Sequence, residues 1–151
     1  SSYVAVKLYF NECLPETSGS RAAAQALVDR LAERTDVVVL SSGRRLDDHV
    51  EWSHDAERVH DASRWLEPGN NLAVQAQIVA GADTLVSTYG GFSYLGPFVG
   101  TPTLALRLGS PDNARHRLAM RAARTGVAYR TARLGREEAV LERLVATRLA
   151  E

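Results

Sequence analysis

The glycine pair Gly90-Gly91 is the part of this chain best suited to chemistry. It follows a predicted strand, Asp83–Ser87, and precedes a predicted short helix and a second strand, Pro102–Leu108. Glycine gives the backbone dihedrals closed to other residues and lets a ligand approach closely. A helix N-terminus adds free N–H groups and a positive dipole end, which favour phosphate. We therefore expect this turn to hold the diphosphate of a nucleotide-linked ligand. A simple tight turn is the alternative.

Hydroxyl groups flank the glycine pair, on Thr88, Tyr89 and Ser93. Each hydroxyl can donate a hydrogen bond to a phosphate or a sugar. For each residue taken alone, solvation at the surface is an equally good interpretation.

Two cationic positions are candidates for the same phosphates. Arg44 and Arg45 follow a predicted strand, and a guanidinium fork can pair with a diphosphate through two hydrogen bonds. We favour Arg44 because it adjoins Gly43; a solvated or ion-paired loop arginine is the alternative. Lys7 lies near the end of an apolar strand, and buried lysines are rare unless paired. It either reaches the mouth of a cleft as a phosphate contact or pairs with an acidic side chain.

The acidic and histidine residues do not predict a metal site. Asp47-Asp48-His49, His54-Asp55 and His60-Asp61 match no tight-ligand spacing, so we interpret them as solvated loop charges and expect no metal. The chain contains no Gly-x-Ser-x-Gly elbow, Walker loop or Gly-x-Gly-x-x-Gly fingerprint.

The elements that must position these residues alternate along the chain. Short apolar segments predict strands at Tyr3–Phe10, Asp36–Ser41, Glu57–His60, Asp83–Ser87, Pro102–Leu108 and Val127–Arg130. Helices are predicted from Ser18 or Ser20 to about Arg34, from Asn70 or Asn71 to about Gly81, after the glycine pair, at Asp112–Thr125 and at Arg136–Leu149. A polar loop is predicted at Ser42–Ala56.

This alternation predicts an α/β fold: a Rossmann-like parallel sheet of about six strands with helices on both faces, a three-layer sandwich. The first long helix is expected to bury Ala24, Leu27, Val28 and Leu31. The second is expected to bury Leu72, Ala76, Val79 and Ala80. Ligands of such folds bind outside the carboxyl ends of the strands, so the loops that follow the strands are the candidates.

Composition narrows the function classes. The net charge is zero, so no overall field draws the chain to nucleic acid or an anionic membrane. Cys13 is the only cysteine, which excludes an internal disulfide and a cysteine-based zinc site. No apolar run approaches the roughly 20 residues of a membrane helix. We expect one cytoplasmic domain over residues 1–151, cut from a longer protein because the chain opens directly on a strand.

The segment around the glycine pair resembles a pattern of one enzyme superfamily. Its matching residues are Ala82-Asp83, Val86, Gly91, Gly100-Thr101-Pro102 and Leu104-Ala105-Leu106. The chain resembles the C-terminal, nucleotide-sugar-binding half of a glycosyltransferase with the GT-B fold, in which two Rossmann-like domains face each other. The spacing from Gly91 to Gly100 is similar to that of the heptosyltransferase-like branch. Asp112-Asn113 stands where many members hydrogen-bond the donor sugar.

The resemblance implies a function and further site residues. It implies transfer of a sugar from a nucleotide diphosphate-sugar to an acceptor, with inversion, and a separate N-terminal acceptor-binding domain that supplies the general base. The isolated domain would then be inactive. Asn11 follows the first strand, where related enzymes line the cleft; capping of the next helix is the alternative. Trp65 and Leu66 stand where the base meets an apolar wall, although a tryptophan is more often a core residue.

Two other classes remain open. The same segment resembles the non-hydrolysing UDP-N-acetylglucosamine 2-epimerases, but Tyr94 and Leu95 replace the paired carboxylates of that family. Loss of an acid/base pair removes the proton chemistry that an epimerase needs. A non-catalytic nucleotide- or small-ligand-binding domain of flavodoxin-like type is the other alternative.

Overall fold

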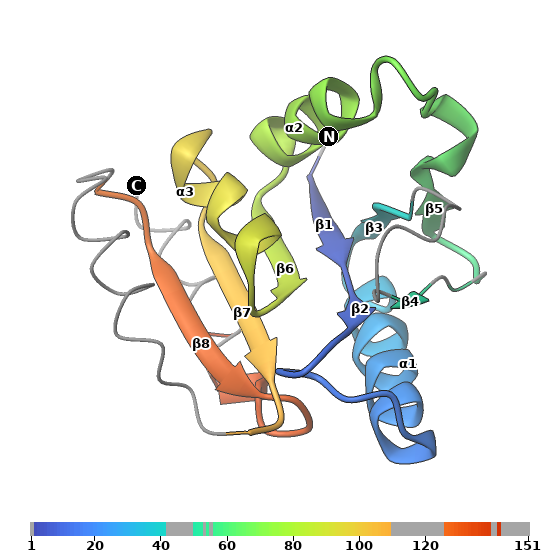
Figure 1. The fold of residues 1–151 in the computed structure, drawn as a ribbon, viewed down its shortest axis with the longest axis vertical. Helices are drawn as coiled ribbons and strands as arrows, with labels where there is room; N and C mark the ends of the chain where they lie inside the picture. The colour runs from blue at the N-terminus through green and yellow to red at the C-terminus, as the bar shows by residue number, and fades with distance from the viewer. Residues whose placement is uncertain are drawn as a thin grey trace.

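The computed structural model describes residues 2–41, 50–52, 54, 56–109, 126–139 and 142. Parallel strands form one six-stranded sheet in the order β5-β3-β1-β6-β7-β8 (Figure 1). Their bounds are β1 Tyr3–Lys7, β3 Asp36–Val39, β5 Val59–Asp61, β6 Thr84–Thr88, β7 Thr103–Arg107 and β8 Tyr129–Arg133. The predicted α/β class and parallel sheet are confirmed.

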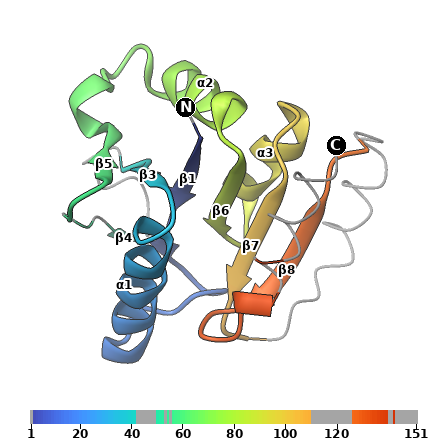
Figure 2. The same ribbon diagram turned by 180° about the vertical axis from the view of Figure 1, so that it is seen from behind.

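Helices cover both faces of the sheet, which Figures 1 and 2 present from opposite sides. They are α1 Ser18–Ala32, α2 Asn71–Gly81 and α3 Leu95–Phe98, with 3-10 helices η1 Ala62–Trp65 and η2 Gly91–Tyr94. Alternate residues of β1 point to opposite faces. Val4 and Val6 pack with α1, whereas Ala5 packs with Val79 of α2. This gives the three layers of the predicted sandwich.

The first predicted strand is wrong at its C-terminal end. The chain leaves the main sheet after Lys7, and Tyr9–Phe10 forms β2, which pairs antiparallel with β4 Val50–Glu51. Residues 4–10 are all buried, so hydrophobicity continues across the break and gives no sign of it. The segment predicted as a polar loop therefore contains a strand at its end.

The first long helix is confirmed, but its cap differs. Ala24, Leu27, Val28 and Leu31 are buried as predicted. Thr17, rather than Ser18 or Ser20, is the N-cap: its side chain accepts from the Ser20 N–H at 3.0 Å, while the Ser20 Oγ accepts from the Thr17 N–H at 2.8 Å. This reciprocal pair is a capping box, which satisfies two donors at once.

The second long helix has the predicted span but a different buried face. Leu72 is 67% exposed and Ala80 is also exposed, whereas Gln75 and Val79 are buried. Gln75 and Val79 are four residues apart and thus lie on one side of the helix. The mostly apolar sequence of α2 does not define which stripe faces the sheet: Val79 is buried as predicted, whereas the predicted burial of Leu72 and Ala80 is wrong.

The remaining elements agree in existence and shift in bounds. The third strand is Val59–Asp61 and the last is Tyr129–Arg133, each displaced toward the C-terminus relative to the prediction. The predicted helix at Asp112–Thr125 and most of the one at Arg136–Leu149 lie outside the described residues. None of the helices in the described ranges combines the length and apolar character that a membrane crossing requires.

Candidate functional site

The strand order places a topological switch point between β1 and β6. Counted along the chain, the order is 3-2-1-4-5-6, and the connections that follow β1 and β6 lead to opposite sides of the sheet. Ligands of open α/β sheets bind at this switch point. Lys7 ends β1 and lies opposite Ser87 of β6, and Gly90-Gly91 follows β6 at the same edge. The topology therefore places the glycine turn at the expected binding edge.

The two glycines have different surroundings. Gly90 takes φ 158° and ψ −167°, and a Cβ there would lie 2.7 Å from the Tyr9 hydroxyl oxygen. Such a conformation is almost confined to glycine. Gly91 is exposed, and a Cβ there would meet nothing within 4 Å. Gly90 is thus required by the fold of the turn, while Gly91 is open to a ligand.

The turn uses most of its own donors. The Ser93 N–H donates to the Gly90 carbonyl at 3.1 Å, and the Gly90 N–H donates to the Ser93 Oγ at 3.4 Å. The Phe92 N–H donates to the Tyr9 hydroxyl. Within the described part of the chain, the Gly91 N–H has no hydrogen-bond partner. The turn thus leaves one backbone donor free, rather than the several of a full helix N-terminus.

The predicted hydroxyl ligands support the turn from inside. Thr88 is fully buried, and its hydroxyl donates to the Tyr9 carbonyl at 2.7 Å and accepts from the Tyr9 N–H at 3.0 Å. The Ser93 hydroxyl donates to the Gly90 carbonyl at 2.7 Å and shares a second hydrogen bond, also 2.7 Å long, with the Tyr129 hydroxyl. Tyr89 is 6% exposed. A ligand contact by Thr88, Tyr89 or Ser93 stays a prediction.

Two tyrosines around the turn remain protonated at neutral pH. Burial raises the pKa of Tyr9 to about 12, the nearby Cys13 adds to the rise, and the Phe92 N–H opposes it. Burial likewise raises the pKa of Tyr129, against the hydrogen bond from Ser93. Both hydroxyls are therefore neutral hydrogen-bonding groups that fix the turn.

Lys7 takes one of the two roles that its sequence position allowed, the pairing with an acidic side chain, and a phosphate contact stays a prediction. Its Nζ lies 2.6 Å from Oε1 of Glu51 in β4, and the side chains are 10% and 16% exposed. The Ser41 hydroxyl donates to the other Glu51 oxygen at 3.2 Å. The Nζ also lies 5.6 Å from the centre of the Phe92 ring. The ammonium is paired with an acid and at the same time sits beside the glycine turn. An ammonium has three donors, so others can reach a ligand.

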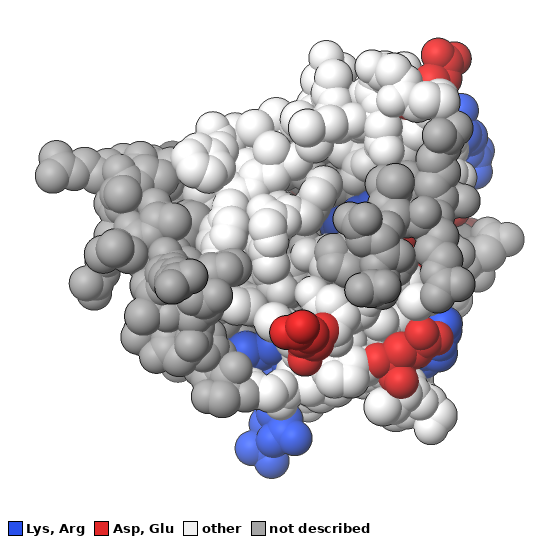
Figure 3. All heavy atoms as spheres, in the orientation of Figure 1, with Lys and Arg blue, Asp and Glu red and all other residues white. Residues whose placement is uncertain are grey.

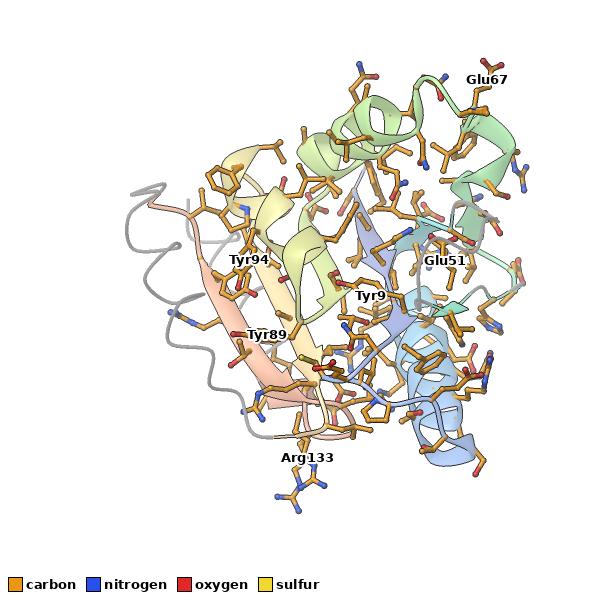
Figure 4. The ribbon with its side chains drawn as sticks, in the orientation of Figure 1. Tyr9, Glu51, Glu67, Tyr89, Tyr94 and Arg133 are labelled. Carbon is orange, nitrogen blue, oxygen red and sulfur yellow. The ribbon has the colours of Figure 1, made fainter. Side chains whose placement is uncertain are left out.

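Asn11 approaches the turn from the loop after β2. Its Oδ1 accepts from the Cys13 and Leu14 N–H groups at 2.9 and 3.0 Å, which folds the loop. Its amide nitrogen lies 3.9 Å from the position a Gly90 Cβ would occupy. Asn11 therefore both shapes the loop and presents an amide donor near Gly90. In Figure 4, Glu51, Tyr9 and Tyr89 follow one another across the middle of the molecule.

The other predicted site residues are not assembled with this group. Trp65 is 49% exposed at the end of η1, with the Arg64 guanidinium 5.7 Å from its ring, so the core interpretation of Trp65 is wrong. Leu66 is half-buried beside it. Both follow β5, two strands away from β1 in the sheet. Arg44, Asp112 and Asn113 lie outside the described residues.

An open apolar groove begins at Gly91. It lies between the first turn of α2 and the η2–α3 segment, and its other lining residues are Leu72, Phe92, Tyr94, Leu95 and Phe98. Leu72 and Phe98 are 67% and 65% exposed. In Figure 3 the described surface over these helices is almost entirely uncharged.

His54 and His60, the two histidines in the described ranges, make local contacts. In the described ranges no three metal-binding side chains converge. His54 lies 2.8 Å from Asp29, and His60 lies 3.6 Å from Asp36. Asp47, Asp48, His49 and Asp55 lie outside the described residues.

Three residues that build the site were not predicted: Tyr9, Glu51 and Tyr129. Tyr9 and Tyr129 occur within strand-like segments and Glu51 within a polar loop, so nothing local distinguishes them. Only Glu51 could have been anticipated in kind from the sequence, because a buried lysine such as Lys7 requires an acidic partner. Comparison with protein-family models, curated proteins and solved structures finds no significant match.

Proposed function

We propose that this domain binds the nucleotide diphosphate-sugar donor of a GT-B glycosyltransferase. The observation that supports it best is the position of the Gly90-Gly91 turn at the switch point between β1 and β6. Lys7 and Asn11 lie at the same point, so a cation and an amide accompany the exposed glycine. These groups suit a diphosphate. The resemblance of the segment around the glycine pair to GT-B glycosyltransferases suggests that the diphosphate carries a sugar.

In this proposal each group has a defined role. The Gly91 N–H, the Asn11 amide and the Lys7 ammonium bind the diphosphate, and the neutral hydroxyls of Tyr9 and Tyr129 hold the turn in place. Fixed donors that meet developing negative charge stabilise a leaving group without reorganisation. The chain would supply this part alone, and an N-terminal domain would supply the acceptor and the general base.

Two observations favour this proposal over the alternatives. Where an epimerase would carry carboxylates, the Tyr94 ring stacks on Tyr129 with centroids 5.6 Å apart, and Leu95 packs against the core. Flavodoxin-like domains have the order 2-1-3-4-5, which differs from the order in this sheet.

Thermal shifts with UDP, GDP, dTDP, ADP and CMP test the proposal. One diphosphate should raise the Tm of the wild type, and Gly91→Asp should abolish the shift because a carboxylate then faces the phosphates. Gly69→Asp is the matched control: Gly69 is also exposed and a Cβ there meets nothing within 4 Å. The proposal fails if no nucleotide stabilises the wild type, or if Gly91→Asp responds as well as Gly69→Asp.

A further inference from the structure

Two arginines face each other where β7 and β8 end. Arg107 and Arg133 are register partners in the parallel ladder. Neighbouring strands lie about 4.8 Å apart, and paired side chains project from the same face. Like charges placed directly opposite each other destabilise a sheet. The fold thus places two arginines at paired positions of neighbouring strands, where an acidic residue opposite one arginine would be more stable.

No acid offsets this pair. In the described part of the chain, neither arginine has a carboxylate within ion-pair distance. Glu12, in the loop after β2, makes no ion pair among the described residues. Nη1 of Arg107 donates to the Gly109 carbonyl, but its Nε is buried and has no hydrogen-bond partner. A buried donor left unsatisfied is costly, and each such group requires an explanation.

The pair lies at the same edge as the glycine turn. The Tyr89 N–H donates to the Leu106 carbonyl at 2.8 Å, which places Tyr89 beside the end of β7. Figure 4 shows Arg133 projecting beyond the end of β8, below Tyr89.

We propose that Arg107 and Arg133 form a subsite for a phosphate group. Planar guanidinium groups bind phosphate oxygens through paired hydrogen bonds. A bound phosphate would accept from the unpartnered Nε of Arg107 and neutralise the repulsion between the two charges. The phosphate belongs either to the proposed donor or to a second phosphorylated substrate. The inference does not require the donor proposal, because inorganic phosphate alone tests it.

Phosphate titrations at constant ionic strength, followed by calorimetry and by Tm, test the subsite. Arg133→Gln should weaken phosphate binding by about tenfold or more, the loss expected for one charge-assisted hydrogen bond. Because Arg133 is exposed, this variant should fold, and without phosphate its Tm should equal or exceed that of the wild type. Arg107→Gln should weaken binding similarly.

Arg130→Gln is the matched control. Arg130 is exposed on the same strand but pairs with Leu104 and projects from the other face. Its phosphate affinity should equal that of the wild type. The proposal is overturned if the wild type does not bind phosphate, or if Arg130→Gln loses as much affinity as Arg133→Gln.

Gly91→Asp separates the two sources of the phosphate. If Gly91→Asp loses UDP while Arg133→Gln retains it, the subsite serves a second phosphorylated substrate. If both Gly91→Asp and Arg133→Gln lose UDP, the subsite holds the donor diphosphate. If no nucleotide binds but phosphate binding still depends on Arg133, the donor proposal fails and the subsite stands.

Discussion

Gly90 carries a steric requirement that Gly91 does not. Gly90→Ala would place a methyl group 2.7 Å from the Tyr9 hydroxyl in a conformation that alanine avoids, so we expect a loss of about 1 to 3 kcal/mol in the free energy of unfolding. Gly91→Ala meets nothing within 4 Å and should change it little. Urea denaturation measures both. Equal losses would show that the close approach of Tyr9 is unimportant.

The Tyr9 hydroxyl predicts a loss of stability at alkaline pH. Its pKa rises from 10.0 in the unfolded chain to about 12 when folded, so between these values the folded state binds more protons and stability falls as pH rises. The effect of this group is about 2 to 3 kcal/mol at most. The free energy of unfolding of Tyr9→Phe should therefore decline less steeply between pH 10 and 12 than that of the wild type. Urea denaturation monitored by circular dichroism at each pH measures both. Below pH 9 the two profiles should run parallel. Profiles that stay parallel up to pH 12 would contradict the assignment.

At the scale of elements, β4 is joined to β1 through one buried ion pair. Glu51→Gln leaves the Lys7 ammonium buried without its counter-ion, and removal of one partner from a buried pair costs several kcal/mol. Because both side chains keep some exposure, we expect about 2 to 3 kcal/mol. Lys7→Met combined with Glu51→Gln should recover part of this loss.

An exposed pair provides the comparison for Lys7 and Glu51. Arg21 and Glu16 also form an ion pair, but their side chains are 47% and 40% exposed. Glu16→Gln should therefore cost no more than about 1 kcal/mol. Urea denaturation of the single and double variants gives the coupling energy between Lys7 and Glu51. A coupling as small as that of the exposed pair would show that β4 is held in another way.

Elements with clear periodicity were predictable, and those without it were not. The buried stripe of α1, from Ala24 to Leu31, follows helical spacing among polar neighbours, so the sequence defined its face. In α2 the apolar residues surround much of the helix, and Gln75 is buried beside the predicted Val79 while Leu72 is exposed. The end of β1 was equally hidden, because Leu8, Tyr9 and Phe10 stay buried after the chain leaves the sheet.

At the scale of the whole molecule, topology brought the site together across long separations. The predicted alternation of elements fixed the carboxyl edge of the sheet and the glycine turn upon it. It could not assign the residues that meet there, since Tyr9 bonds Thr88 across 79 positions and Ser93 bonds Tyr129 across 36. Such pairs depend on strand order and register, which a single sequence does not state.

One ion pair joins distant parts of the chain on the side of the molecule that carries α1. Arg30 and Glu137 are 107 positions apart, and Nη2 of Arg30 lies 2.6 Å from Oε1 of Glu137. The arginine side chain is 44% exposed, but Glu137 is 1% exposed and its other oxygen has no partner. The carboxylate therefore depends on Arg30 for its only compensation among the described residues.

Removal of Arg30 should thus destabilise the fold more than neutralisation of the Glu137 carboxylate. Arg30→Leu leaves an unpaired buried carboxylate, and we expect a loss of about 2 to 4 kcal/mol in the free energy of unfolding. Adding Glu137→Gln to Arg30→Leu should restore much of it, because a neutral amide is cheaper to bury than a charge. Arg30, Arg34 and Glu137 all line one small cavity. Arg34→Leu is therefore the control and should have little effect. If Arg30→Leu and Arg34→Leu unfold at the same urea concentration, the contact between α1 and Glu137 rests on packing alone.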